Sequence, residues 1–216
     1  MRDKMKAHRI DRGIFLLDRT GISAVKRELR KSIIERRDAL SADLRMEMSG
    51  VITAKLTELE ACGRAEIVLA YMSFGSEFDT TGFARHVMES GKALALPKLR
   101  KDRSGLDLYV VSSLEDGLEP GLWGIREPRD GMMIEDFSLI DFVLVPGVAF
   151  TRTGGRLGYG GGFYDRLLVG KRRDALAVAA AFSVQIVEEV PIEENDIFMD
   201  GVVTEKGEHF RIREDR

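Results

Sequence analysis

Residues 156–166 form the stretch Arg-Leu-Gly-Tyr-Gly-Gly-Gly-Phe-Tyr-Asp-Arg, and six of the nine residues from 154 to 162 are glycine. An apolar run over residues 140–145 predicts a buried strand before it, and apolar spacing over residues 164–169 predicts a short helix after it. A glycine-rich turn between a strand and a helix brings backbone N–H groups close to an anion at the positive end of the helix dipole. The stretch therefore favours phosphate binding, with a flexible surface loop as the alternative.

The glycine spacing matches neither of two common phosphate-binding motifs. The Walker motif is absent, because no Gly-Lys-Ser/Thr closes the turn. The dinucleotide fingerprint is incomplete, because Phe163 stands where its third glycine would fall. Charged side chains nevertheless suit a nucleotide: Arg156 and Arg166 are cations that can bind phosphate, and Asp165 offers a hard oxygen ligand for Mg²⁺.

The order of predicted elements defines the fold class. Helices are predicted at residues 23–37, 42–60 and 79–89, and strands at residues 67–71, 92–96, 106–111, 140–145, 175–181 and 202–204. Strands alternating with helices predict a single three-layer α/β domain, a mostly parallel sheet with helices on both faces. Residues 112–135 are expected to form a long loop that holds Trp123. Ligands bind such sheets beyond the carboxyl ends of the strands, where the turns at 73–77, 97–98 and 146–162 are expected to fall.

Local signals predict where several elements begin and end. Ser23, Ser41 and Asp79 are predicted to cap the starts of three helices. Gly91 is predicted to stop the third helix, and Pro97 is predicted to end the strand that follows it.

The composition is that of an ordinary globular protein. The chain has 216 residues, of which 44% are hydrophobic and 32% charged, enough for one domain with a sizeable core. A net charge of −3 argues against a nucleic-acid partner, which calls for a basic surface. The single cysteine, Cys62, fits a reducing, cytoplasmic compartment. No apolar run reaches the length of a membrane helix, so no membrane association is expected, and a monomer is the favoured state.

The predicted domain covers residues 23–216. Residues 1–22 are expected to form a disordered or loosely attached extension, because the apolar run at 14–17 is too short for a signal-peptide core. The three histidines lack metal-ligand spacing.

Segments along most of the chain resemble one known family. Residues 145–150 (Val-Pro-Gly-Val-Ala-Phe), Gly154 and the stretch 156–166 are similar to the signature of the 5-formyltetrahydrofolate cyclo-ligases, also called 5,10-methenyltetrahydrofolate synthetases. Further similar segments follow the family's order, namely Lys26 to Arg30, Glu77 to Thr80, Pro97-Lys98, Trp123 to Pro128, Ala181 to Gln185 and Pro191 to Asp196. The resemblance runs from about residue 23 to about residue 205.

The resemblance implies an activity and a set of site residues. The activity is the ATP- and Mg²⁺-dependent cyclisation of 5-formyltetrahydrofolate, which can carry a polyglutamate tail, to 5,10-methenyltetrahydrofolate with release of ADP and phosphate. The residues implied to act in catalysis are Arg156, Lys26 and Tyr164. Those implied to bind ATP are Lys26, Arg27, Arg30, Arg156, Leu157, Gly158, Tyr159, Gly160, Gly161, Gly162, Phe163 and Tyr164. Those implied to bind the folate are Met72, Glu77, Trp123, Tyr159 and Phe163, and those implied to hold Mg²⁺ are Asp165 and Asp196.

Three positions depart from the family pattern. Thr151 stands where many relatives have Asp, and Phe163 replaces a common Tyr. Gly161 stands where some relatives place a Lys that reaches phosphate. The contact that this Lys would make with phosphate is then expected from backbone amides or from another cation, namely Lys26, Arg30 or Lys98.

Each functional interpretation has a structural alternative. Lys26 and Arg30, which share a helical stripe with Arg37, bind phosphates or form a solvated basic face. Glu77 orients the folate or complements a helix dipole. Trp123 stacks on the folate or plugs its loop onto the core. In the same way, Asp196 holds metal or belongs to a solvated acidic turn.

Two other functions stay open from the sequence. One is a folate or nucleotide sensor that kept the pocket and lost the chemistry. The other is a kinase or ligase of the same fold that acts on another acyl or formyl substrate.

Overall fold

The computed structural model describes residues 9–10, 14–15 and 19–211. Most of the predicted N-terminal extension, residues 1–22, lies outside these ranges. Within them, Arg9–Ile10 (β1) and Ile14–Phe15 (β2) pair as antiparallel strands, and helix α1 spans Arg19–Asp38.

In the described part of the chain, an eight-stranded sheet has the order β14-β13-β12-β9-β3-β4-β5-β8. Its strands are β3 (Ile67–Leu69), β4 (Ala93–Leu99), β5 (Leu106–Val111), β8 (Met132–Ile134), β9 (Phe142–Val145), β12 (Leu176–Ala180), β13 (Gly201–Thr204) and β14 (Gly207–Phe210). The five strands from β13 to β4 run parallel, and β14, β5 and β8 join antiparallel at the two edges. The prediction of a mostly parallel sheet with a central strand near residues 140–145 is confirmed.

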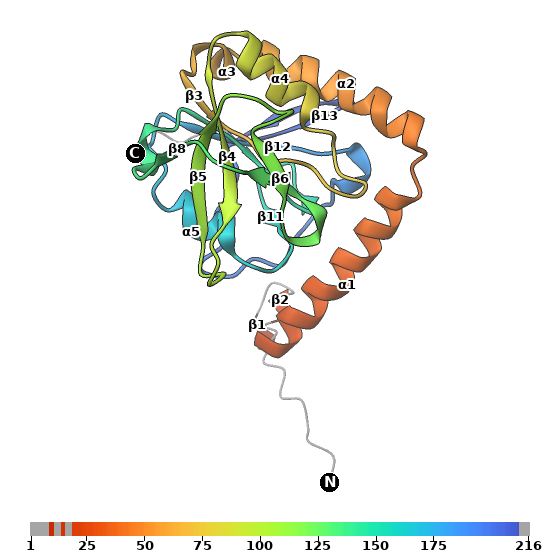
Figure 1. Ribbon diagram of the computed structural model, residues 1–216. Helices are drawn as coiled ribbons and strands as arrows, with labels where there is room; N and C mark the ends of the chain where they lie inside the picture. The colour runs from red at the N-terminus through yellow and green to blue at the C-terminus, as the bar shows by residue number, and fades with distance from the viewer. Residues whose placement is uncertain (1–8, 11–13, 16–18, 212–216) are drawn as a thin grey trace.

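Helices cover both faces of this sheet. Figure 1 shows three helices on one face, α2 (Ala42–Glu58), α3 (Glu60–Arg64) and α4 (Thr81–Glu89), with the short α5 (Phe163–Leu168) on the opposite face. Strand β9 faces both layers: Phe142 and Leu144 pack with α2 and α4, whereas Val143 and Val145 pack with α5. All four side chains are fully buried. Each such side chain contributes about 1.5–3 kcal/mol through the apolar surface that it removes from water.

Helix α1 lies beside the sheet rather than on one of its faces (Figure 1). Its Ile33 packs in a separate apolar cluster with Ala149 and Leu157. These two residues belong to β10 (Ala149–Phe150) and β11 (Arg156–Leu157), which pair antiparallel. The contact places α1 directly against the chain that leads into the glycine-rich stretch.

The predicted helix starts are partly correct. Ser41 caps α2 as predicted, and its hydroxyl accepts a hydrogen bond from the backbone N–H of Leu44 at 3.2 Å. Ser23 lies inside α1, so its predicted capping role is wrong; the helix begins one turn earlier. Thr80 is the residue that precedes α4, and the predicted cap Asp79 accepts a hydrogen bond from the backbone N–H of Thr81, the first residue of the helix, at 2.9 Å.

The structure also corrects the predicted strand boundaries and the loop at 112–135. Strand β4 continues through Pro97, where it still pairs with β5. Its other neighbour, β3, pairs with β4 only up to Ala95, so the missing N–H of the proline costs no hydrogen bond to β3. The region 112–135 contains β6 (Leu118–Pro120) paired with β7 (Arg126–Pro128), and its β8 joins the sheet. Three-residue strands with proline and glycine nearby are too short to show a period in the sequence. Strand β14, which the prediction missed, returns from β13 as a hairpin.

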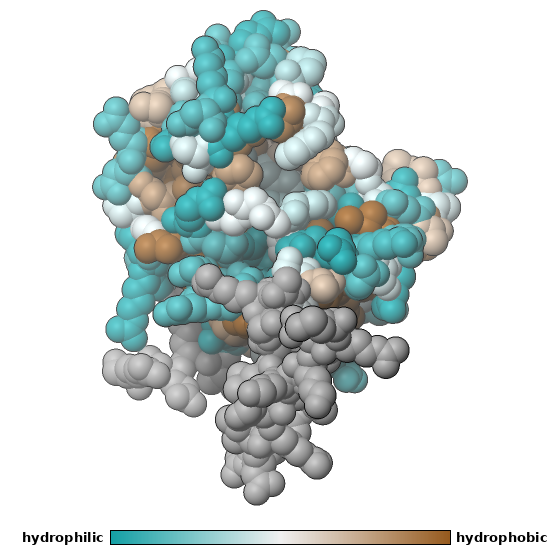
Figure 2. All heavy atoms as spheres, turned by 90° about the horizontal axis from the view of Figure 1, so that it is seen from below, coloured by the Kyte–Doolittle hydropathy of each residue, from teal (hydrophilic) through white to brown (hydrophobic). Residues whose placement is uncertain are grey.

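The described surface is largely hydrophilic where it is seen from below, with scattered apolar areas between the polar side chains (Figure 2). Among the described residues, no helix has both the length and the apolar character needed to cross a membrane.

Candidate active site

A cavity of about 750 Å³ opens beyond the carboxyl ends of β3 and β9. Helix α1, the β6–β7 hairpin, the residues after β11 and the turn at 193–196 line it together. Of the predicted site residues, the structure brings these to its wall: Lys26, Arg30, Met72, Glu77, Trp123, Arg156, Leu157, Gly158, Tyr159, Gly160, Gly161, Gly162, Phe163, Tyr164, Asp165 and Asp196. Sheet topology therefore gathers segments that are far apart in the sequence, as expected for this fold class.

Arg27 is the predicted site residue that does not line the cavity. Its side chain is 74% exposed and lies near Glu28, with 3.6 Å between the guanidinium nitrogen and the carboxylate oxygen. The structure therefore does not support the predicted contact between Arg27 and a nucleotide.

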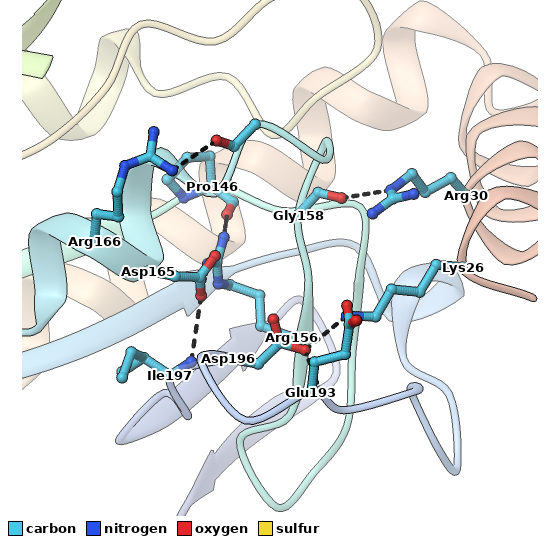
Figure 3. Close-up of polar contacts among 11 residues, drawn as sticks. Lys26, Arg30, Pro146, Arg156, Gly158, Asp165, Arg166, Glu193, Asp196 and Ile197 are labelled. Atoms are coloured by element: carbon cyan, nitrogen blue, oxygen red, sulfur yellow. Dashed lines mark hydrogen bonds and ion pairs between the residues drawn. The ribbon is translucent and has the colours of Figure 1, made fainter. Parts of the chain in front are cut away.

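Residues 158–162, here called the Gly-rich loop, present free backbone donors. The N–H groups of residues 159–162 donate to no acceptor within the described part of the chain. Gly160 has a φ of +104° and Gly162 a φ of +63°, conformations that side chains with a Cβ rarely adopt. Arg30 steadies the loop, because its Nε donates to the carbonyl of Gly158 at 2.8 Å (Figure 3). The loop is thus a preformed nest for an anion.

A partly buried ion pair lies next to the loop. Arg156 Nη2 and Asp165 Oδ1 are 2.6 Å apart, and Arg156 Nη1 donates to the carbonyl of Pro146 at 3.2 Å (Figure 3). Two buried donors on this wall, Arg156 Nε and the Tyr164 hydroxyl, have no hydrogen-bond partner among the described residues. Burial raises the pKa of Tyr164, so its hydroxyl stays protonated and can donate. Unpaired buried donors are costly, so each of the two favours a hydrogen-bond acceptor supplied by a ligand.

The positive charge of Lys26 is compensated by two carboxylates. Its Nζ lies 2.7 Å from both Glu193 and Asp196, which fixes α1 to the turn at 193–196 (Figure 3). Burial lowers the pKa of Lys26, but the hydrogen bonds to the two carboxylates outweigh burial and the pKa is raised. Lys26 therefore stays charged, with its charge already compensated. In contrast, Arg30 pairs with a neutral carbonyl and is the cation more available to a phosphate.

Lys98, the other predicted substitute for a phosphate-binding Lys, is committed elsewhere. Its Nζ lies 2.8 Å from Glu119 Oε1 and donates to the carbonyl of Pro128 at 2.7 Å. Lys98 therefore ties the β6–β7 hairpin to β4 and does not line the cavity.

Glu77 and Tyr159 form the other end of the cavity. The Tyr159 hydroxyl donates to Glu77 Oε1, and the backbone N–H of Phe74 donates to Glu77 Oε2 at 3.1 Å. Glu77 is only 8% exposed, and the hydrogen bonds to its carboxylate come from Tyr159 and Phe74. Burial raises the pKa of Glu77, while Tyr159, Phe74 and Arg37 partly oppose the shift. This end offers a carboxylate for a polar group on a flat ligand, with Met72 on the same wall.

Arg37 is a functional candidate for which the sequence analysis predicts no role of its own. It is 3% exposed and donates to Ser76 Oγ at 2.9 Å and to the Tyr159 hydroxyl at 3.0 Å. The predicted basic stripe of Lys26, Arg30 and Arg37 was the available signal, but nothing local indicated which residues lie opposite it.

Trp123 lies at the rim of the cavity, in the turn Leu122–Gly124 (η1) between β6 and β7. Its side chain is 74% exposed, so the alternative that it plugs its loop onto the core is wrong. An exposed aromatic ring at a cavity rim is available for stacking on a flat ligand.

We expect the Trp123→Ala substitution to raise the KM for a folate substrate about fivefold to tenfold, because the stacking surface is lost while the fold keeps its core. Thermal unfolding should be unchanged, since the side chain is exposed. Trp123→Phe should restore most of the affinity. Equal KM values for the wild type and the alanine variant would contradict the stacking role.

Asp165 and Asp196, the carboxylates predicted to hold Mg²⁺, are each paired with a cation in the structure, Asp165 with Arg156 and Asp196 with Lys26. Asp165 and Asp196 line the same cavity, and the backbone N–H of Ile197, next to Asp196, donates to Asp165 Oδ1 at 3.3 Å. The described residues hold no group of three or more His, Cys, Asp or Glu side chains placed to bind a metal. Two carboxylates completed by phosphate oxygens and water are the usual ligands of Mg²⁺ at nucleotide sites.

A loop with free backbone N–H groups and a buried carboxylate in one cavity at the strand ends are features expected of a nucleotide-dependent α/β enzyme. The family model of the 5-formyltetrahydrofolate cyclo-ligase family matches residues 22–205. The chain therefore belongs to the 5-formyltetrahydrofolate cyclo-ligase family, and the expectation of a ligase from that family is confirmed.

Individual relatives agree with this assignment. The 5-formyltetrahydrofolate cyclo-ligase of Escherichia coli K12 is 33% identical over 174 residues, covering 80% of this chain and 96% of the relative. The mouse enzyme of the same name is 28% identical over 193 residues, covering 85% and 95%. A solved structure of 5,10-methenyltetrahydrofolate synthetase from Aquifex aeolicus is 36% identical, with a TM-score of 0.78 over 89% of this chain and 95% of that one.

Proposed function

We propose that this protein cyclises 5-formyltetrahydrofolate to 5,10-methenyltetrahydrofolate and consumes ATP in doing so. The formyl oxygen attacks the γ-phosphorus, which forms an O–P bond and releases ADP. N10 then attacks the activated formyl carbon and loses its proton, and the C–O bond breaks to release phosphate. The first transfer turns a poor leaving group into a good one, so the protein needs to position the reactants and offset charge.

The observation that carries this proposal is that the Gly-rich loop and Glu77 share one cavity and meet at Tyr159. A γ-phosphate at the loop and a reduced pterin at Glu77 would then face each other within the same space. Family membership supports the same pair of substrates.

The phosphate end supports the transfer step. The free N–H groups of the Gly-rich loop would bind the phosphate oxygens, and Arg30 would add charge from α1. Arg156 Nε and the Tyr164 hydroxyl would donate to the oxygen on which negative charge develops. The pair of Asp165 and Asp196 would hold Mg²⁺, which when bound offsets phosphate charge.

The folate end supports orientation of the substrate. Ionised Glu77 would accept hydrogen bonds from N–H groups of the reduced pterin, and Met72 and Phe163 would contact its apolar surfaces. Trp123 would cover the bound folate from the rim.

The role of Glu77 predicts a specific pH dependence. Because burial raises the pKa of Glu77, its carboxylate takes up a proton at a higher pH than an ordinary glutamate, and kcat/KM for the folate should fall as the pH drops through that raised pKa. At neutral pH, Glu77→Gln should lower kcat/KM for the folate about 10- to 100-fold through the lost charged hydrogen bond. A pH profile of the variant should lack the acid limb. The same acid limb in the variant would contradict the assignment.

Further properties of this function are also proposed. We propose that the protein acts as a monomer. Action in the cytoplasm is supported by the lone, buried Cys62, and the lack of a nucleic-acid partner is supported by the net charge of −3.

The reaction is tested by measuring ADP release with and without the folate. The proposal predicts one ADP per methenyl product and no ADP without the folate. ADP release that is indifferent to the folate would indicate another acyl substrate or a hydrolase, and tight folate binding without ADP release would indicate a sensor.

A further inference from the structure

Helix α1 holds two consecutive residues of the Gly-rich loop with two arginines. Arg30 and Arg37 are seven residues apart, two helical turns, so they lie on the same face of α1. Arg30 binds the carbonyl of Gly158, and Arg37 binds the hydroxyl of Tyr159. Figure 3 shows the first of these contacts reaching from α1 to the loop.

Arg37 also reaches the turn that carries Glu77. Its Nε donates to Ser76 Oγ at 2.9 Å, and Ser76 in turn donates to the carboxylate of Asp38. One buried guanidinium is therefore bonded on one side to the Gly-rich loop and on the other to the turn at 73–77. Each of these bonds spans 39 residues or more along the chain.

The orientation of Tyr159 follows from this arrangement. A guanidinium can only donate, so Arg37 Nη1 occupies an acceptor site of the Tyr159 oxygen. The single hydroxyl hydrogen is then left for Glu77 Oε1, to which Tyr159 donates. Burial raises the pKa of Tyr159, so that hydrogen stays in place at neutral pH.

We propose that Arg37 is a positioning residue for the reaction: it fixes the Tyr159 hydroxyl so that this hydroxyl donates to Glu77, and it thereby keeps the folate-binding carboxylate oriented and ionised. The proposal rests on the proposed function and adds to it a residue that lies outside the cavity wall. Arg37 acts through Tyr159 and Glu77 and touches no substrate.

The charge environment of Glu77 makes this role measurable. The groups that face Glu77 are Tyr71, which follows β3, Tyr164 from α5, Tyr159 from the Gly-rich loop and Arg37 from α1. Arg37 is the cation among them, and Asp38 lies beyond Ser76. Removing the Arg37 charge should shift ionisation of Glu77 towards higher pH.

The test compares Arg37→Met with the matched control Arg36→Met, an exposed neighbour on the same helix. Arg37→Met should lower kcat/KM for 5-formyltetrahydrofolate about tenfold or more, with a change in the KM for ATP below about threefold, because Arg30 still holds Gly158. Its acid limb should move to higher pH. Arg36→Met should match the wild type, and Arg37→Lys, which keeps the charge, should keep the acid limb near its wild-type position.

A double-mutant cycle separates positioning from a general effect on folding. If Arg37 acts through Tyr159, Arg37→Met should cost much less in a Tyr159→Phe background than in the wild type. Additive losses, or an unmoved acid limb in Arg37→Met, would overturn the proposal. An inactive wild type would refute the proposed function instead. The coupling between Arg37 and Tyr159 would then be measured through folate binding, as the quenching of Trp123 fluorescence by 5-formyltetrahydrofolate.

Discussion

Arg156→Met is expected to lower kcat about 100- to 1,000-fold, the loss typical of removing one preorganised donor from a developing negative charge. Arg156 is buried, it pairs with Asp165, and its Nε is a donor without a partner among the described residues. An effect on kcat rather than on the KM for ATP is expected, because the donor is used most strongly in the transition state. Steady-state kinetics with both substrates would measure it.

The control for this substitution must account for stability. Breaking this partly buried ion pair leaves Asp165 uncompensated and should cost about 1–3 kcal/mol. The double variant Arg156→Met with Asp165→Asn removes both charges and should recover most of this stability while staying inactive. Arg152→Met, at an exposed arginine, should retain full activity. A folded Arg156→Met variant with the wild-type kcat would contradict the role of Arg156.

Gly160→Val is the second substitution with a large expected effect. The φ of Gly160 is +104°, and an added Cβ would meet only the Arg30 guanidinium, at an ordinary 3.7 Å. The backbone conformation, not space, therefore forbids the side chain. We expect the loop to change conformation, its N–H groups to turn away from the phosphates, and kcat/KM for ATP to fall about 100-fold.

Gly91→Val is the matched control. Gly91 also has a positive φ, +77°, stands in open space after α4, and does not line the cavity. Both variants should lose about 1–3 kcal/mol of stability from backbone strain. Only Gly160→Val should lose ATP binding, as measured by calorimetry with a non-hydrolysable analogue. An unchanged affinity in that variant would show that the Gly-rich loop does not bind phosphate.

The sequence predicted the features that depend on local pattern. The central strand, the cap at Ser41 and the loop between β11 and α5 each follow from periodicity or residue chemistry over a few positions. Parallel-sheet topology then placed the turns of separate strands at one edge, which is why most predicted site residues line a single cavity.

The errors within the site concern partners that are distant in the chain. Arg27 and Arg30 both looked suited to phosphate, but only the packing of Ile33 on β10 and β11 decides which of them faces the loop. Lys26 meets carboxylates 167 and 170 residues away, and Arg37 meets Tyr159 122 residues away. No local signal in a single sequence carries such pairings.

The most direct test of the account is absorbance over time for the purified protein with 5-formyltetrahydrofolate, ATP and Mg²⁺. The methenyl product is conjugated and absorbs at a longer wavelength than the substrate. The account predicts a rising signal that needs all three components and is lost in Arg156→Met. A flat trace from folded wild-type protein that binds both substrates would contradict it.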